Sequence, residues 1–196
     1  MSCTPTEPLE IYDDLSVLQD FINNSPNLNM ILDMDSSGTI EPVELGEQIW
    51  NDNGRIILLN CYNIGLSGGI PESIGDLTEL TQLGLTNNNL SGEIPESIGN
   101  LINLTQLSMG YNSLSGSIPE SIGNLKNLMV LDVSHNNLEG SIPNSIRNLT
   151  ALVNFLADSN NLNLIIPEDF CTIYPNLGNY DLSGNQFCPP LPSCID

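Results

Sequence analysis

Hydrophobic residues recur through the middle of this chain with a period of 24. Residues 80–151 divide into three blocks of 24, which read LTQLGLTNNNLSGEIPESIGNLIN, LTQLSMGYNSLSGSIPESIGNLKN and LMVLDVSHNNLEGSIPNSIRNLTA. In the first block Leu83 and Leu85 lie two residues apart, so in an extended strand both leucines point to one side and the residues between them to the other. Each block therefore predicts a short strand with one buried and one exposed side.

Asparagine recurs at the turn that leaves each predicted strand, at Asn88, Asn112, Asn136 and Asn160. An amide at such a turn can bond to backbone groups that have just lost their ladder partners, so we expect an internal ladder of asparagines. Repetition at roughly 20–29 residues, with Leu at fixed offsets and Asn in one slot, is typical of a leucine-rich repeat solenoid. Each coil of such a stack buries its apolar side only against its neighbours.

The same register extends to six coils, which begin at residues 56, 80, 104, 128, 152 and 177. The first coil is degenerate, since Ile64 occupies the asparagine position. Six strands at a spacing of about 4.8 Å predict a parallel sheet roughly 25–30 Å long. We therefore expect one α/β solenoid domain, with a helical cap over residues 1–53, repeats over 54–176, and the last coil and C-terminal cap over 177–196.

The N-terminal region has helical periodicity in place of the repeat pattern. Leu15, Leu18 and Ile22 follow at helical spacing from the start of a first helix near residue 13, and a second helix is expected to carry the apolar residues of 28–32. An uncapped solenoid exposes both its core and a strand edge. The two helices are therefore predicted to form a lid on the first coil.

The segment DMDSSGTIEPVE, residues 33–44, matches the twelve-residue EF-hand calcium loop at each defining position, with Gly38 at the sharp turn. Helices are expected on both sides of the loop, the second one carrying Leu45 and Ile49. A lone loop of this kind predicts one structural Ca²⁺, which would offset repulsion within an acidic cap. The alternative is an acidic turn that binds no metal. The predicted ligands are Asp33, Asp35, Ser37, Thr39, Glu41 and Glu44.

The net charge of the protein limits the classes of molecule that it can bind. The 196 residues include 24 acidic and three basic side chains, for a formal net charge of −21. We expect neither nucleic acid nor an anionic membrane surface as a partner, because affinity for both needs clustered Lys or Arg. The apolar runs are shorter than the roughly 18 residues of a membrane span, and no basic segment precedes an apolar one near the N-terminus. We therefore expect neither a transmembrane helix nor a signal peptide in this sequence.

Acidic residues also recur with the repeat. Glutamate follows the repeat's proline in four coils, which would place these carboxylates one coil apart along the stack. Two interpretations are open: a solvated face, and a ridge that binds cations. The four residues are Glu72, Glu96, Glu120 and Glu168.

The five cysteines indicate an oxidising, extracellular compartment. Cys194 has two candidate partners: Cys188 lies within the terminal cap, and Cys171 falls in the adjacent coil at nearly the same turn. Cys61 occupies a leucine position, so it is expected to be a buried apolar residue, or the partner of Cys3 if the leader folds back.

The phrase LSGEIPESIGNL and its copies resemble the plant-type repeats of polygalacturonase-inhibiting proteins and receptor-kinase ectodomains over residues 54–196. The resemblance implies a right-handed solenoid with a concave parallel sheet, short 3₁₀ or extended turns on the convex side, and binding of proteins, peptides or glycans on the concave face. The ending GNQFCPPLPSC resembles the receptor-kinase terminal cap, which implies a disulfide between Cys188 and Cys194. The front end, IEPVELGEQIW after the calcium loop, instead resembles repeat proteins of marine bacteria.

Small polar residues dominate the outward strand positions, and the chemically varied ones are the predicted ligand-binding residues. An aromatic platform beside carboxylates suits a sugar or a short polar peptide; a merely solvated strand surface is the alternative. No nucleophile motif accompanies the single histidine, so we do not expect an enzyme. We expect a secreted or cell-surface module that binds an extracellular protein, peptide or glycan, with a structural adhesin or self-associating unit, and a glycosidase inhibitor, as alternatives. The predicted ligand-binding residues are Tyr62, Tyr111, Asp132, His135 and Asp158.

Overall fold

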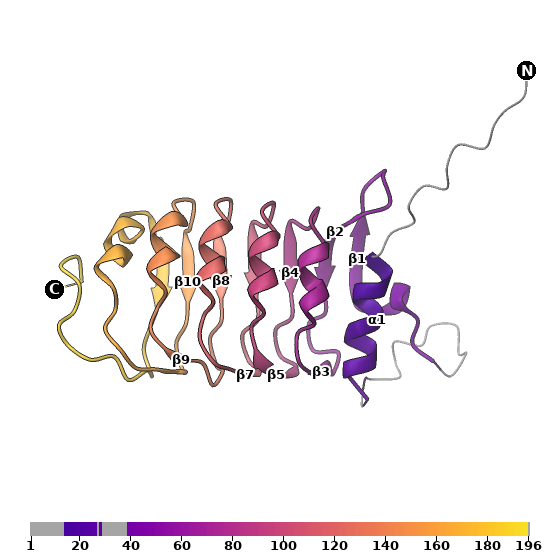
Figure 1. Ribbon diagram of the computed structural model, residues 1–196, viewed down its shortest axis with the longest axis horizontal. Coiled ribbons are helices and arrows are strands. Elements are labelled where there is room, and N and C mark those ends of the chain that lie inside the picture. Colours follow the sequence, from indigo (N-terminus) through magenta and orange to yellow (C-terminus); the bar gives the residue numbers. More distant parts are fainter. Residues whose placement is uncertain (1–13, 27, 29–38, 196) are drawn as a thin grey trace, which may run out of the picture.

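The computed structural model describes residues 14–26, 28 and 39–195, and its coils follow one another along the long axis of the molecule (Figure 1). A seven-stranded sheet runs the length of the stack in the order β1-β2-β4-β6-β8-β10-β12. The six predicted repeat strands are present and parallel, which confirms the solenoid. The strands are β1 (Glu47–Trp50), β2 (Ile56–Asn60), β4 (Gln82–Gly84), β6 (Gln106–Ser108), β8 (Val130–Asp132), β10 (Asn154–Leu156) and β12 (Asn179–Asp181).

Short 3₁₀ helices lie on the side of the stack opposite this sheet, and shorter strands connect the two sides. Each of η3 to η7 begins directly after a proline, whose ring holds φ near −67° at the entry to the helix. The helices are η2 (Pro42–Glu44), η3 (Glu72–Asp76), η4 (Glu96–Asn100), η5 (Glu120–Asn124), η6 (Asn144–Asn148), η7 (Glu168–Thr172) and η8 (Tyr174–Asn176). The short strands are β3 (Ser67–Gly68), β5 (Asn89–Glu93), β7 (Ser113–Ser115), β9 (Glu139–Gly140) and β11 (Asn161–Leu162).

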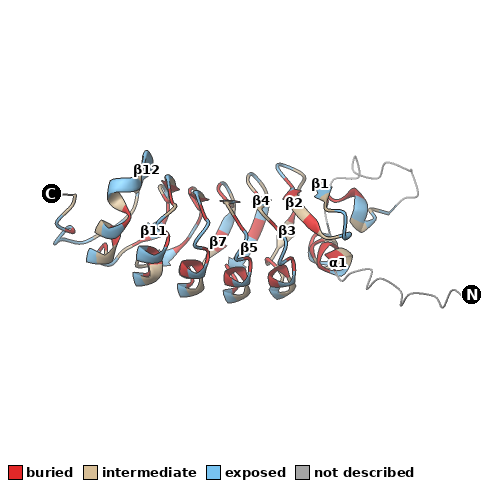
Figure 2. Ribbon diagram, turned by 90° about the horizontal axis from the view of Figure 1, so that it is seen from above, coloured by how far each residue is buried: buried red, intermediate tan, exposed pale blue. Residues whose placement is uncertain are grey.

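The core fills the space between the main sheet and the 3₁₀ helices, where buried residues line the inner side of each coil (Figure 2). The predicted asparagine ladder is confirmed. Asn112 accepts the Leu90 N–H at 3.0 Å through Oδ1 and donates to the carbonyls of Leu85 and Met109 at 3.0 Å through Nδ2. One side chain therefore ties its own turn to the preceding coil.

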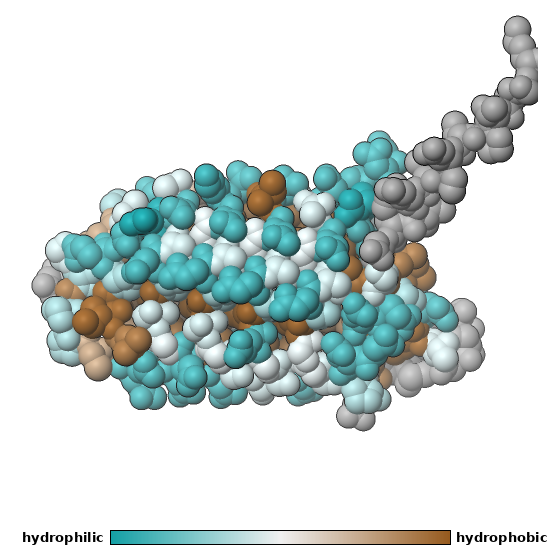
Figure 3. All heavy atoms as spheres, viewed as in Figure 1, coloured by the Kyte–Doolittle hydropathy of each residue, from teal (hydrophilic) through white to brown (hydrophobic). Residues whose placement is uncertain are grey.

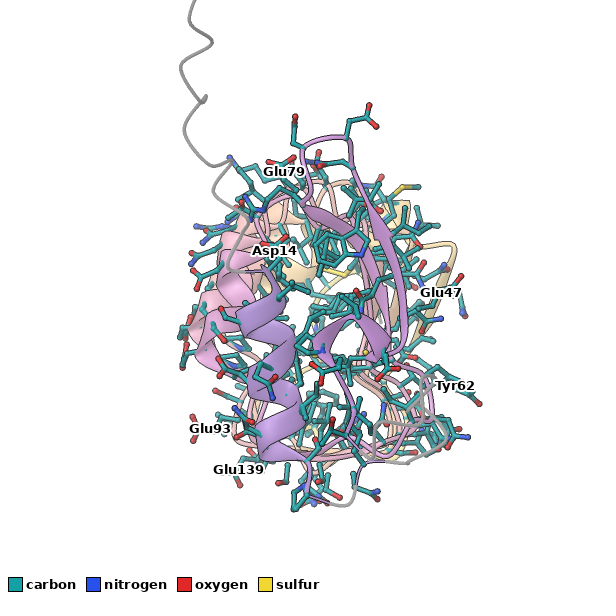
Figure 4. The ribbon with its side chains drawn as sticks, turned by 90° about the vertical axis from the view of Figure 1, so that its right-hand side faces the viewer. Asp14, Glu47, Tyr62, Glu79, Glu93 and Glu139 are labelled. Atoms are coloured by element: carbon teal, nitrogen blue, oxygen red, sulfur yellow. A yellow bond between two sulfur atoms is a disulfide. The ribbon has the colours of Figure 1, made fainter. Side chains whose placement is uncertain are left out.

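The N-terminal end is closed by helix α1 (Asp14–Asn24), which lies across the first coil (Figure 4). The helix buries Val17, Leu18 and Phe21 against the first coil. Asp14 is 1% exposed; it accepts the Ile56 N–H at 2.8 Å and pairs with Arg55 at 2.9 Å. The beginning of the helix is thus bonded directly to the beginning of β2.

The predicted helix after the calcium loop is wrong. Residues 42–44 form the single 3₁₀ turn η2, and residues 47–50 form β1, which pairs antiparallel with β2. Leu45 is buried as expected, but Ile49 is 46% exposed. The physical reason is the open edge of β2, whose backbone N–H and C=O groups need partners that a helix cannot supply. In the predicted helix before the loop, Leu28 is buried, and residues 29–32 lie outside the described part.

The predicted disulfide between Cys188 and Cys194 is also wrong. Cys194 bonds to Cys171, with the two Cα atoms 5.5 Å apart, whereas Cys188 is a free, exposed thiol. The reason is the direction of the terminal segment: Cys188 is bonded through its N–H to the carbonyl of Leu164, and the chain then crosses back to η7, where Cys171 lies. Cys61 is buried and free, and burial raises the pKa of its thiol to about 12. Cys3 lies outside the described residues.

Candidate ligand-binding face

The concave surface of the main sheet is built from side chains at equivalent positions of successive strands. Parallel pairing without a register shift stacks these positions into rows across the sheet. The central row contains Asn60, Gly84, Ser108, Asp132, Leu156 and Asp181. Because the repeat keeps the inward positions apolar, the differences between coils are concentrated on this outward side.

Three of the predicted ligand-binding residues come together where the strands end. The rings of Tyr111 and His135 stack with their centroids 4.0 Å apart and an angle of 15° between their planes. Nδ1 of His135 lies 3.3 Å from Oδ2 of Asp158. The two atoms do not have hydrogen-bond geometry, and Nδ1 is also screened from solvent. The side chains of His135 and Asp158 remain 40% and 16% exposed, so a ligand can reach the group.

Tyr111 and His135 have left-handed backbone conformations, with φ of 55° and 51°. The equivalent positions in other coils are Asn63, Asn87, Ser159 and Gly184. Asparagine, histidine and glycine adopt this region comparatively readily, whereas a tyrosine there costs about 1 kcal/mol or more. Because the left-handed turn recurs in each coil, it is a property of the repeat, and what distinguishes these two coils is that their turns place two aromatic rings side by side.

Asp132 is near this group but is directed toward its own turn. Its Oδ1 accepts hydrogen bonds from Ser134, at 3.0 Å from the backbone N–H and 2.7 Å from the hydroxyl. A Cβ atom at Gly110 would lie 2.8 Å from the same oxygen, so this carboxylate occupies space that only glycine leaves open. Asp181 repeats the arrangement two coils later: its hydrogen bonds with Ser183 lower the pKa of its carboxyl group.

Tyr62 belongs to a different part of the face, because one whole coil lies between its coil and that of Tyr111. It is 58% exposed and points away from the body of the stack (Figure 4). It lines a hollow of ≈ 300 Å³ over β2, β4 and β6. This hollow is not predicted by the repeat pattern; the signal for it in the sequence is Gly84, which lies between longer polar residues. Its other polar lining residues are Asn60, Gln82, Thr86, Gln106 and Ser108.

The three basic residues lie away from this face. Arg55 pairs with Asp14 at the N-terminal cap, Lys126 follows η5, and Arg147 in η6 pairs with Asp169 at 3.1 Å. The charged groups at the strand ends are therefore carboxylates, together with His135 when it is protonated. The face is suited to a polar or cationic ligand rather than an anionic one.

The row of glutamates on the convex side has a structural use. Glu96 accepts the Ser121 N–H of the next coil at 3.2 Å, and Glu120 accepts the Ser145 N–H at 3.1 Å. These N–H groups belong to the first turn of the next 3₁₀ helix and have no partner within that helix. The Ser193 hydroxyl donates to Glu168, the Ser193 N–H makes the same bond as in the inner coils, and the two together lower the pKa of Glu168.

The described half of the predicted calcium loop contains Thr39, Glu41 and Glu44. Glu41 and Glu44 form a capping box: the Glu41 N–H donates to Glu44 Oε2 at 2.9 Å, and the Glu41 side chain faces the Glu44 N–H in return. The Glu44 N–H also donates to the Glu41 carbonyl at 2.9 Å, as in a 3₁₀ turn. The Thr39 hydroxyl donates to Glu41 Oε1 at 3.4 Å. Asp33, Asp35 and Ser37 lie outside the described residues, and within residues 14–26, 28 and 39–195 no three His, Cys, Asp or Glu side chains gather in a metal-binding arrangement.

Comparison with known proteins identifies the repeats. Two models of the leucine-rich repeat match residues 79–101 and 102–162. No match is found among curated protein sequences. Among the helices that the structure describes, none has the length and apolar character needed to cross a membrane.

Solved structures extend the likeness over most of the chain. The BIR3–SERK2 complex from Arabidopsis thaliana contains a chain that is 33% identical, with a TM-score of 0.71; the match covers 92% of this protein and 99% of that chain. The PEPR1–AtPEP1 complex is 28% identical with a TM-score of 0.83, and the match spans 93% of this protein but only 26% of that chain. A plant ice-binding protein is 32% identical with a TM-score of 0.72, over 89% of this protein and 56% of that chain. This chain belongs to the leucine-rich repeat family.

Proposed function

We propose that this protein is an extracellular interaction module that binds a polar peptide or a protein segment through the concave face of its sheet. The observation that carries the proposal is the Tyr111–His135 stack beside Asp158, in which Tyr111 occupies a left-handed backbone position that is unfavourable for a bulky residue. A stacked pair of rings gives a rigid, amphipathic contact surface, and the adjacent carboxylate supplies an acceptor for N–H donors. Such a combination suits the backbone and basic side chains of a peptide.

The comparisons support the class of function but not the ligand. Two of the similar structures are complexes, PEPR1 with AtPEP1 and BIR3 with SERK2, while a third is an ice-binding protein. One fold therefore supports different activities, and the function must be argued from the site. This chain spans about a quarter of the length of the PEPR1 chain, so the activity of that whole receptor is not transferred to it.

The experiment is retention of extracellular proteins, peptides and polysaccharides on the immobilised protein, followed by titration of each retained component. Tyr111→Ala and His135→Ala should each weaken binding by about 1 kcal/mol or more if the rings are contacts, since aromatic contacts dominate small interfaces. Tyr62→Ala is the matched control, because it removes an exposed tyrosine from the separate hollow. Unchanged affinity in both first variants would contradict this assignment of the site.

The same experiment separates the alternatives. A glycan ligand would be retained from the polysaccharide fraction, and a glycosidase inhibitor would lower glycanase activity on mixing. A structural adhesin would form concentration-dependent oligomers without retaining a soluble component.

We also propose that the N-terminal cap binds one structural Ca²⁺ through Asp33, Asp35, Ser37, Thr39, Glu41 and Glu44. The proposal rests on the twelve-residue motif, and the geometry of the described half supports it: Glu44 is 8% exposed and its position relative to Glu41 is set by the capping box. A buried carboxylate next to a second one is costly unless a cation or hydrogen bonds compensate it. The Glu41 N–H supplies part of that compensation at Glu44 Oε2, and a divalent ion with oxygen ligands would add to it.

Calorimetric titration with calcium tests the site directly. Glu44→Gln should lower calcium affinity at least about tenfold, because the bidentate carboxylate at the last position of the loop carries much of the binding. Glu72→Gln, in a coil outside the cap, is the control with the same change of charge. A chelator should accelerate amide exchange in residues 39–52 before the repeats. Absence of both heat and a thermal shift at millimolar calcium would rule the site out.

A further inference from the structure

The hollow beside Tyr62 is caused by a change in side-chain size along the central row of the sheet. This row is short in two successive coils, at Gly84 and Ser108, and is filled in the next two by Asp132 and Leu156. The short residues leave a hollow of ≈ 300 Å³ over β2, β4 and β6. Binding sites for small molecules have volumes of about 300–1,000 Å³, so the hollow has room for a small molecule or a short segment of a chain molecule.

The side chains that line this hollow are uncharged throughout its described residues, although the chain has a net charge of −21. Amide and hydroxyl groups supply its polarity, and both kinds of group can donate as well as accept hydrogen bonds. A charged ligand would find no opposite charge in this lining, whereas a neutral ligand rich in hydroxyl groups would find partners for its donors and its acceptors. The polar lining residues are Asn60, Tyr62, Gln82, Thr86, Gln106 and Ser108.

The amides of the hollow are available to a ligand. Asn60 and Gln82 are exposed and make no side-chain hydrogen bond within the described part of the chain. Gln106 donates through Nε2 to the Ser108 hydroxyl, and this bond is long, at 3.3 Å. Gln82 and Gln106 are partners in the parallel register, so they lie about 4.8 Å apart on neighbouring strands. Two amides at this spacing can bond to hydroxyl groups of one sugar ring or of two linked rings.

A peptide is less suited to this hollow than to the strand ends. An extended peptide binds a sheet by adding a strand at an open edge. The backbone below the hollow is already paired, β2 with β4 and β4 with β6, so it offers no such edge. Among the lining residues there is also no carboxylate comparable to Asp158 beside His135.

Tyr62 adds an apolar surface to this polar lining. The residue is 58% exposed, so its ring is accessible to a ligand. The face of an aromatic ring is apolar, while the hydroxyl of tyrosine remains in water. The C–H face of a sugar ring can pack against such a surface while its hydroxyl groups reach the amides. In the other coils small or polar residues occupy the row of Tyr62, namely Thr86, Gly110, Ser134, Asp158 and Ser183.

We propose that this hollow binds a neutral oligosaccharide, with one sugar ring packed against Tyr62 and hydroxyl groups of the sugar bonded to Gln82 and Gln106. The site is separate from the Tyr111–His135 group, so its test is independent of the proposed function. Glu47 of β1 lies opposite Asn60 on the same face, and Figure 4 shows Glu47 on the same side of the molecule as Tyr62. This carboxylate and the net charge disfavour sugars that carry carboxylate or sulfate groups.

Titration with short oligosaccharides, followed through the side-chain amide signals in NMR spectra, tests the site. The probes are hexasaccharides of glucose, mannose and xylose, which are neutral, and the hexasaccharide of galacturonate, which is anionic. At least one neutral probe should shift the signals of Gln82 and Gln106 and leave that of Asn154, on strand β10, unchanged. The galacturonate probe should bind more weakly at low salt, and this difference should shrink as salt screens the repulsion.

Gly84→Leu fills the hollow and should reduce binding below detection. Leu156 occupies the same row on β10, so the sheet accommodates leucine there, and the close neighbour of a new Cβ would be Asn60 Oδ1, at 2.7 Å, on an exposed side chain that can rotate. Tyr62→Ala should lower the affinity about fivefold or more, whereas Tyr62→Phe keeps the ring and should retain most of it. Tyr111→Ala is the matched control, because it removes an exposed tyrosine from the other site.

Four results would overturn the proposal: no binding of any neutral probe at about 10 mM, equal affinity for the galacturonate probe at low salt, binding that persists in a folded Gly84→Leu variant, or a loss in Tyr111→Ala as large as in Tyr62→Ala. Because the two tyrosine variants remove only exposed side chains, their comparison decides the question even if Gly84→Leu does not fold.

Discussion

Each end of the solenoid would expose its core and the edge of a strand, and the two ends differ in how these are covered. At the N-terminal end, β1 pairs with the edge of β2, α1 covers the core of the first coil, and Asp14, a buried carboxylate paired with the partly exposed Arg55, joins α1 to β2. Both the sheet edge and the core of the first coil are therefore covered. The core and the strand edge that a repeat stack would otherwise expose at this end are covered by α1 and β1, which do not follow the repeat pattern.

At the C-terminal end the chain is anchored, but the sheet is not covered. The Cys171–Cys194 disulfide and the bonds from Ser193 to Glu168 tie the last segment to η7, on the convex side. The sheet edge at β12 stays exposed, and an apolar hollow of ≈ 480 Å³ beside Leu164 and Ile165 lies near the same end, where Figure 3 shows apolar side chains gathered. A crosslink restrains a terminal segment without satisfying strand backbone, so only the N-terminal end is closed.

The largest effect is expected from opening the closed end. Asp14→Ala removes a buried carboxylate that serves both Arg55 and the Ile56 N–H, and breaking such a buried pair costs about 3–5 kcal/mol. Urea unfolding followed by the fluorescence of Trp50, the only tryptophan and a residue of β1, measures the loss. Asp169→Ala, which breaks the exposed pair with Arg147, should cost less than about 1 kcal/mol. Equal losses would show that the first coil does not depend on this pair.

A smaller loss of stability is expected from removing one asparagine of the ladder, and its size should differ between the middle of the stack and the open end. Asn136 is 7% exposed and accepts the Leu114 N–H at 2.9 Å; Asn185 makes the equivalent bond to the Leu162 N–H at 3.1 Å but is partly exposed. Asn136→Ala should cost about 2–3 kcal/mol, since the buried Leu114 N–H and the carbonyls that receive the Asn136 amide lose their partner, and Asn185→Ala about 1 kcal/mol, since water replaces the amide. Denaturant titration of both variants checks the difference, and a larger loss at Asn185 would contradict an open end.

The smallest effect is a local dependence on pH at the C-terminal cap. Bonds from Ser193 lower the pKa of Glu168 below its ordinary value of 4.5, so the carboxylate stabilises the folded cap above that pH. This contribution is lost as the pH falls through the lowered pKa in the folded state. The protection factor of the Ser193 amide, in which the intrinsic pH dependence of exchange is divided out, should therefore fall only below pH 4.5. Glu168→Gln should remove this change in protection, and a protection factor that still falls with pH in the variant would assign the effect to another group.

Much of the fold could be predicted because its signal is local and repeated. The spacing of Leu83 and Leu85, copied every 24 residues, predicts both the strands and their parallel order, and the asparagine slot predicts the ladder. The candidate site could be predicted in part. Tyr111, His135 and Asp158 were expected on one face, and the structure brings them together, whereas Tyr62 was grouped with them and lies over another hollow.

The sequence by itself determined the number of coils, the buried side of each and the acidic character, because these follow from the order and type of residues within one period. Tertiary structure alone decided that residues 47–50 form a strand, that Cys194 pairs with Cys171, and that β12 has an exposed edge. Each of these depends on which backbone groups or side chains a neighbouring coil brings within bonding distance. That information is set by the packed stack, because the atoms concerned are far apart along the chain and become neighbours only in three dimensions.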